Sequence, residues 1–221
     1  MQLVVFNGSP RGMKSNTRLL MEQMLAGYES AGGEANVFVH LLAKTGQLAG
    51  QVAAYEAADL AILAFPLYTD SMPGIVKAFI EALAPVQKQP GFRIGFLVQS
   101  GFPEAVHCAH VEAYLEKLAD RLRAEYIGTI IKGGVEGIQI QPEQMTRKLY
   151  ESMRAFGKDL AETGTWDVDR IMVLRKPYRF SALNGFLFRI ISLTGLTNYY
   201  WNMKLREHDA YDRRFDRPYQ P

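Results

Sequence analysis

Hydroxyl and basic side chains gather in a short stretch near the start of the chain. They are Ser9, Arg11, Lys14, Ser15 and Thr17. Hydroxyl groups donate hydrogen bonds to anionic oxygens, and guanidinium and ammonium groups supply the opposite charge. These residue types, so closely spaced, indicate a site for an anion such as a phosphate group.

The residues on either side predict a strand before this stretch and a helix after it. Residues 3–6 are all apolar, as in a strand buried on both faces, and leucine and methionine recur at helical spacing between residues 19 and 25. Ser15 or Asn16 can cap the helix, whose first N–H groups lack partners and carry partial positive charge. Such a helix start binds phosphate, although the same turn also occurs where it only caps a helix.

Two common phosphate-binding motifs do not fit the stretch. A P-loop, G-x-x-x-x-G-K-[ST], counted from Gly8 would need glycine where Met13 stands. The dinucleotide fingerprint G-x-G-x-x-G is absent, and no acidic residue ends the second predicted strand. These mismatches argue against a classical nucleoside triphosphate and against NAD bound in the Rossmann manner.

Apolar runs alternate with helical patterns along the first part of the chain, which predicts an α/β fold with a doubly wound, five-stranded parallel sheet. We expect strands at residues 3–6, 35–41, 59–65, 92–98 and 126–131, and helices at residues 16–31, 47–58, 73–83, 104–123 and 142–163. The natural order for such strands is 2-1-3-4-5. Ligands then bind at the carboxyl ends of the strands, where the order reverses between strands one and three.

Two later loops should face the same crevice. The loop after the third strand contains Pro66, Leu67, Tyr68 and Thr69, and the loop after the fourth contains Ser100, Gly101 and Phe102. Tyr68 either packs against an aromatic ligand or covers the core. From the residues alone, the crevice is expected to hold the phosphate group, and both roles of Tyr68 stay open.

These segments resemble the flavodoxin-like NAD(P)H-dependent FMN reductases over about 165 residues. The resemblance rests on Asn7-Gly8-Ser9-Pro10-Arg11 with Ser15-Asn16-Thr17, and on Pro66-x-Tyr68 with Met72-Pro73. It implies that Ser9, Arg11, Ser15, Asn16 and Thr17 hold the FMN phosphate. It also implies that Pro66, Leu67, Tyr68, Thr69, Ser100, Gly101 and Phe102 lie against the flavin ring.

The resemblance implies an FMN-dependent oxidoreductase. NADPH or NADH would give a hydride to flavin N5, and a small acceptor (a quinone, a nitro or azo compound, a metal ion or free flavin) would take the electrons. The flavin does the chemistry, so no catalytic side chain is expected. Arg175, Lys176 and Arg179 either contact a 2′-phosphate or form a solvated basic surface. Family members typically dimerise, so a homodimer is expected.

Two alternatives remain. One is a flavodoxin-type electron carrier, although such carriers are usually smaller and strongly acidic, whereas this chain has 221 residues and a net charge of +2. The other is a non-catalytic interaction module with the same fold. The intact 9–17 stretch argues against a module that has lost its ligand.

Composition limits the remaining possibilities. Cys108 is the one cysteine, which excludes an internal disulfide and a cysteine-ligated iron–sulfur cluster and suits a reducing cytoplasm. The chain enters its first strand directly, so no signal peptide is expected. Cys108 stands beside His107, but adjacent helical residues point to different faces. We therefore expect a buried structural cysteine, with no Cys/His catalytic pair and no metal site.

The sequence predicts a flavodoxin-like domain at residues 1–165 and a helical, aromatic-rich extension at residues 166–221. The extension carries ten Lys and Arg against six Asp and Glu. It either packs on the body, forms a dimer surface or lid, or lies on a membrane. Aromatic residues are enriched at protein interfaces, which favours packing with dimerisation. The interleaved acids argue against nucleic-acid binding.

Overall fold

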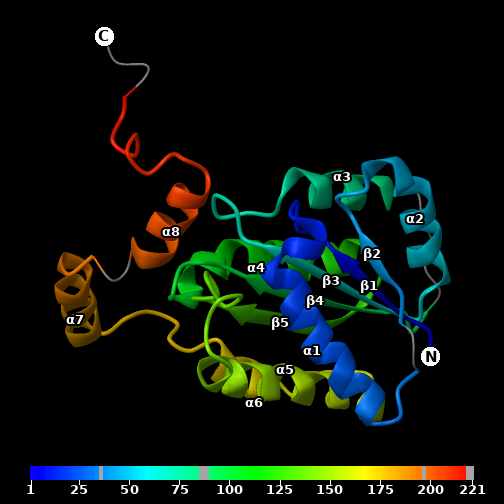
Figure 1. Ribbon diagram of the computed structural model, residues 1–221. Coiled ribbons are helices and arrows are strands. Elements are labelled where there is room, and N and C mark those ends of the chain that lie inside the picture. The colour runs from blue at the N-terminus through cyan, green and yellow to red at the C-terminus, as the bar shows by residue number, and fades with distance from the viewer. Residues whose placement is uncertain (35–36, 85–89, 196–197, 218–221) are drawn as a thin grey trace. The chain divides into compact units, whose positions relative to one another are not determined.

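Five parallel strands form one sheet in the computed structural model, which describes residues 1–34, 37–84, 90–195 and 198–217 (Figure 1). The strands are β1 (Leu3–Asn7), β2 (Val39–Leu41), β3 (Leu60–Pro66), β4 (Arg93–Gln99) and β5 (Glu125–Lys132). Their order is β2-β1-β3-β4-β5, and every neighbouring pair is parallel. The predicted order is confirmed.

Helices cover both faces of the sheet (Figure 1). On one face lie α1 (Asn16–Ser30), α5 (Glu143–Thr163) and α6 (Val168–Leu174), and on the other lie α2 (Leu48–Ala57), α3 (Gly74–Ala82) and α4 (Ala109–Arg121). Alternate side chains of a strand point to opposite faces. Val4 and Phe6 therefore join the core under α2, α3 and α4, while Leu3 and Val5 join the core under α1 and α5.

Two predicted elements differ in extent from those in the structure. The second strand is shorter than the predicted residues 35–41: β2 pairs with β1 only over Val39–Leu41, and Phe38 before it is 79% exposed at the edge of the sheet. The first two residues of that prediction, Ala35 and Asn36, lie outside the described residues. The helix predicted over residues 104–123 begins as a separate 3-10 turn, η3 (Ala105–Cys108), followed by α4.

The chain divides into two compact units, Met1–Arg179 and Phe180–Pro221. The expected boundary after residue 165 lies inside the first unit, because Trp166 and Ile171 are buried in the core beside β5. They fill space left by glycines: a methyl group on Gly95 or Gly128 would press against these two side chains. Residues 166–174 therefore belong to the body, with Trp166 and Ile171 in its core.

Residues 175–179, called the strap below, are also tied to the first unit. Arg175 forms an ion pair with Glu112 of α4. The backbone N–H of Ala105 donates to the Pro177 carbonyl at 3.0 Å, and that of Val106 donates to the Tyr178 carbonyl at 2.9 Å. The strap thus holds the 3-10 turn that follows β4.

The second unit contains α7 (Ala182–Leu193) and α8 (Tyr199–Glu207). Ser181 caps α7 by accepting a hydrogen bond from the Asn184 backbone N–H at 3.2 Å. No described residue of this unit is buried. Across the described part of the chain, no helix is long and apolar enough to cross a membrane.

Candidate functional site

A cleft lies at the carboxyl ends of β1, β3 and β4, at the place where the strand order reverses. Its lining includes nine of the residues predicted from the sequence: Ser9, Arg11, Ser15, Asn16, Pro66, Leu67, Tyr68, Ser100 and Gly101. It also includes Gln99 and Glu136, which were not among the predicted residues. Three predicted residues, Thr17, Thr69 and Phe102, are not in the lining.

Asn7, the last residue of β1, organises the first loop from beneath. Its Oδ1 accepts a hydrogen bond from the Ser9 backbone N–H at 2.9 Å. Its Nδ2 donates to the Gly12 carbonyl and to Ser15 Oγ, each at 3.3 Å. Asn7 is fully buried, so one amide fixes three points of the loop. An asparagine that ends a strand before a turn is the signal that could have identified this role.

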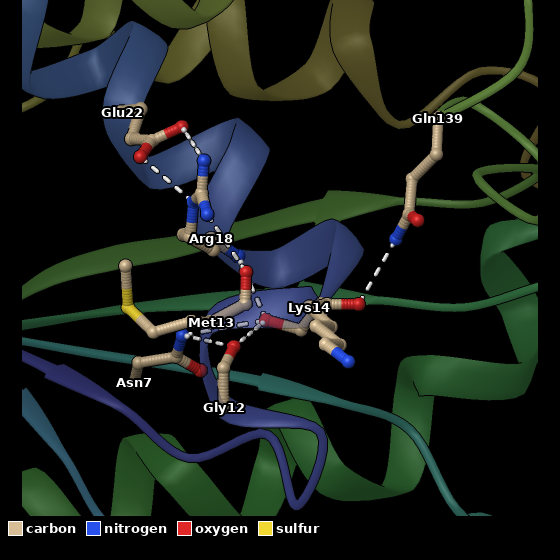
Figure 2. Close-up of polar contacts among 8 residues, drawn as sticks. Asn7, Gly12, Met13, Lys14, Arg18, Glu22 and Gln139 are labelled. Carbon is tan, nitrogen blue, oxygen red and sulfur yellow. Dashed lines mark hydrogen bonds and ion pairs between the residues drawn. The ribbon is translucent and has the colours of Figure 1, made fainter.

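Side chains from different elements bind the carbonyls of residues 12 to 14 (Figure 2). Asn7 contacts the first, Arg18 Nη1 donates to the second at 2.8 Å, and Gln139 Nε2 donates to the third at 3.1 Å. Arg18 also forms an ion pair with Glu22 at 2.7 Å. The turn before α1 is therefore held by β1, by α1 itself and by the segment after β5.

Ser15 is the N-cap of α1. Its Oγ accepts from the Arg18 backbone N–H at 3.1 Å and donates to the Gly12 carbonyl at 2.7 Å. The N–H groups of Asn16 and Thr17 stand in the first helical turn, where no carbonyl of α1 can reach them. No other residue in the described ranges accepts from them. These two donors, together with the positive end of the helix dipole, suit a phosphate group.

The side chains of Asn16 and Thr17 brace the walls of the cleft. Asn16 Nδ2 donates to the Val135 carbonyl, and its Oδ1 accepts from Gln139 Nε2, both at 2.9 Å. Thr17 is fully buried, and its Oγ1 accepts from Gln99 Nε2 at 3.2 Å. Both residues therefore have donors for an anion in their backbone N–H groups, while their side chains connect α1 to the other loops.

The second loop is a tight two-residue turn. Tyr68 and Ser71 exchange backbone hydrogen bonds of 2.8 and 3.0 Å, and the residues between them, Thr69 and Asp70, have φ values of 49° and 59°. Positive φ at both central positions defines a type I′ turn, a conformation that is uncommon for a β-branched residue such as threonine. Thr69 is exposed on this turn, while the half-exposed Tyr68 borders the cleft.

The third loop is built on contacts with β5. The Ser100 N–H donates to the Lys132 carbonyl at 3.0 Å, and Ser100 Oγ donates to the Phe102 carbonyl at 3.1 Å. The Phe102 ring lies against the His107 ring, with centroids 4.5 Å apart, and is half exposed. Glu136 stands close to Gly101. It is the acidic group of the cleft lining, and no local pattern of the sequence marks it.

Cys108 lies outside the cleft lining and is fully buried, as predicted. Burial, followed by the nearby Glu112 carboxylate, raises the pKa of this thiol to about 11. A thiol that stays protonated at neutral pH is a poor nucleophile. No cluster of His, Cys, Asp and Glu suited to a metal ion occurs in the described ranges.

Solved structures with the same arrangement of elements include three reductases. The first is an FMN-dependent NADH-azoreductase from Bacillus anthracis, with a TM-score of 0.57 and 14% sequence identity over 72% of this chain and 99% of that one. The second is an NADPH-quinone reductase from P. pentosaceus, with a TM-score of 0.53 and 17% identity over 71% of this chain and 98% of that one. The third is an NAD(P)H:quinone oxidoreductase from Methanothermobacter marburgensis, with a TM-score of 0.52 and 14% identity over 72% of this chain and 96% of that one. At these identities the similarity establishes the fold alone.

Comparisons of sequence place the chain more directly. No curated protein sequence matches it. A sequence model of a protein family matches residues 1–160, which make up most of the first unit, and this family is described as having a flavodoxin-like fold. The sheet order and the cleft between β1 and β3 are those expected of that fold. The chain belongs to the family of proteins with the flavodoxin-like fold.

Proposed function

We propose that the chain is an oxidoreductase that binds FMN in this cleft and passes electrons from NADPH or NADH to a small acceptor. The observation that carries the proposal is the pair of unpartnered N–H groups at the start of α1, opening into a cleft lined by loops from three strands. The names of the three similar structures, an azoreductase and two quinone reductases, support the same reaction class.

The residues of the first loop fit the phosphate of FMN. A phosphate dianion needs several donors and positive charge. The N–H groups of Asn16 and Thr17 and the Ser9 hydroxyl are the donors, and Arg11, exposed at the rim, supplies the charge. The Ser15 hydroxyl is used to cap the helix, so its contribution is to fix the position of these donors.

The other two loops fit the ring of the cofactor. Pro66, Leu67 and Tyr68 form one wall, and Ser100 and Gly101 form part of another. Gly101 has no side chain, which lets a flat ring approach the backbone, and Tyr68 offers an aromatic face. Bound FMN supplies the hydride acceptance and electron transfer. The protein's own contribution is to bind and orient the ring, without an acid, a base or a nucleophile.

The ion pair of the strap limits which basic residues are available to contact a 2′-phosphate of the nicotinamide nucleotide. Of the three basic residues considered for a 2′-phosphate, Arg175 is committed to Glu112, while Lys176 and Arg179 are exposed. Those two residues either contact a 2′-phosphate or belong to a solvated basic surface. The proposal includes a homodimer, a small-molecule acceptor and a reducing cytoplasmic setting, in which the single thiol stays reduced.

An absorbance spectrum tests the proposal. We expect the purified protein to show a flavin spectrum, or to gain one when FMN is added, and anaerobic NADPH or NADH to bleach it. A flavin spectrum that neither nucleotide changes would favour an electron carrier, and a protein that takes up no FMN would refute both assignments. Ser9→Ala should weaken FMN binding about tenfold, which corresponds to one hydrogen bond to a charged group. Ser152→Ala, on the outer face of α5, serves as the matched control.

A further inference from the structure

The second unit consists largely of apolar surface that nothing within the unit covers. Helix α7 has a broad apolar face, with Asn184, Arg189 and Ser192 on its other side, and its exposed apolar side chains are Leu183, Phe186, Leu187, Phe188, Ile190, Ile191 and Leu193. Leu193 is 85% exposed and Leu183 66%. A segment that buries none of its apolar side chains gains no hydrophobic stabilisation by itself. The second unit therefore gains hydrophobic stabilisation only if something outside the unit covers the apolar side chains of α7.

Along the chain, the charges nearest to α7 are positive, and the acidic residues Asp169 and Glu207 border this stretch. From Arg170 to Arg206 the sequence contains seven Lys and Arg residues and no Asp or Glu. Two of the seven are paired within the first unit, Arg170 with Asp159 and Arg175 with Glu112. A third, Lys204, forms an ion pair with Glu207 at 2.7 Å. Along the chain, Lys176 and Arg179 come shortly before α7, Arg189 lies within it, and Arg206 follows it. An apolar surface among cations is complementary to an anionic lipid surface.

Aromatic residues flank α7 on both sides. Tyr178 and Phe180 precede it, and Tyr199 and Trp201 begin α8. Tyrosine and tryptophan side chains, each with an apolar ring and a polar group, are enriched at the level of lipid headgroups. The order along the chain is therefore basic and aromatic, then apolar, then aromatic and basic. This is the order expected of a helix that lies along a membrane surface.

We propose that α7 docks this protein in the plane of an anionic bilayer, with its apolar side chains in the outer acyl region and the flanking cations on the headgroups. The helix has 12 residues and rises about 1.5 Å per residue, so it is much shorter than the ~30 Å hydrocarbon core. It lies in the interface and does not span it. A second copy is the less favourable occupant, because symmetric pairing would bring two acid-free helices together without an opposite charge.

Vesicle flotation tests the proposal with the full-length protein. We expect the protein to float with phosphatidylcholine vesicles that contain about 30% phosphatidylglycerol, and to bind pure phosphatidylcholine at least about tenfold more weakly. High salt should reduce the binding. Flotation separates vesicle-bound protein from aggregates, which sink. Equal binding to both vesicle types, or no flotation with the anionic ones, would overturn the proposal.

Variants in α7 locate the binding surface. The double variant Phe186→Ser, Ile190→Ser should abolish flotation, while Arg189→Gln should weaken it about fivefold, the effect of one cation near the surface. Neither change touches a buried residue, and circular dichroism checks that the body stays folded. Phe38→Ser, which alters an exposed aromatic residue of the first unit, is the matched control and should bind normally. Flotation of the double variant would refute the proposal. The proposal would also be refuted if the wild-type protein did not float and instead formed a dimer in lipid-free solution that the double variant dissociates.

Discussion

Gln99 Nε2 donates a hydrogen bond to Thr17 Oγ1 at 3.2 Å, which joins the end of β4 to the first turn of α1 beneath the cleft. Both residues are buried. Thr17→Val keeps the shape of the side chain but leaves the Gln99 amide without this acceptor, so it should lower the free energy of unfolding by about 1–3 kcal/mol. Urea denaturation measures the loss.

A double variant separates this hydrogen bond from simple packing. Thr17→Val with Gln99→Met removes both partners, so its cost should be smaller than the sum of the two single costs. Strictly additive costs would show that the two side chains do not interact energetically.

Gly8 is required by the packing of the first loop against α3. A methyl group there would overlap Val76 Cγ2 and would stand 3.1 Å from Phe65 Cβ. Gly8→Ala should therefore destabilise the fold by about 1–3 kcal/mol. Gly50→Ala is the matched control, because Gly50 lies within α2 with open space around it, and alanine there should stabilise the protein by up to about 1 kcal/mol. Thermal unfolding of the two variants should shift in opposite directions.

Asn7 should govern cofactor affinity without touching the cofactor's phosphate. Asn7→Ala removes three hydrogen bonds that hold the first loop, so FMN affinity should fall at least about tenfold, or about 1.4 kcal/mol. Titration of the apoprotein with FMN, followed by quenching of flavin fluorescence, measures this. Asn202→Ala in α8 is the control and should bind FMN normally. Equal affinity of the two variants would mean that the loop keeps its shape without the Asn7 amide.

Cys108 should make stability fall at alkaline pH. Its folded pKa is about 11 against an ordinary value of 9.0, so between these values the unfolded chain releases a proton that the folded chain keeps. Stability is then fully present below pH 9 and decreases as the pH rises, by about 1.4 kcal/mol for each unit. From pH 8 to pH 10, the wild type should lose about 1 kcal/mol more than Cys108→Ala in urea unfolding. Equal losses would show that the thiol does not contribute.

Two truncations test where the body ends. A chain that stops after Arg179 loses no buried residue and should unfold at nearly the same urea concentration as the full chain. A chain that stops after residue 165 loses Trp166 and Ile171 from the core, and removal of a buried tryptophan alone costs about 3–5 kcal/mol. If both truncated chains were equally stable, the packing of residues 166–179 would contribute nothing to the fold.

The central sheet could be predicted because its signal is local. Strands β1 and β3 are buried along their whole length, so their sequences are continuous apolar runs, and the loop-to-helix stretch between residues 7 and 17 carries its own capping residues. Once the strand order is known, the topology brings the loops after β1, β3 and β4 together. Most of the cleft lining therefore followed from the sequence.

The remainder depends on contacts between distant segments. Glu136 enters the cleft because Asn16 and Ser100 both bind Val135 beside it, and no local pattern reveals this. Trp166 follows a helix-ending glycine and looks like the start of a tail, yet it fills a hollow that Gly95 and Gly128 leave on two different strands. The extent of the body could not be read from composition for this reason.

The internal bonding of the first loop also has a kinetic consequence. Its shape is fixed by Asn7, by the Ser15 cap and by Gln139, all of which act within the chain. A phosphate-bearing ligand that arrives there has no segment to order before it binds, so encounter by diffusion sets the association rate. Variants that weaken individual donors should therefore change the residence time of the ligand much more than its rate of capture.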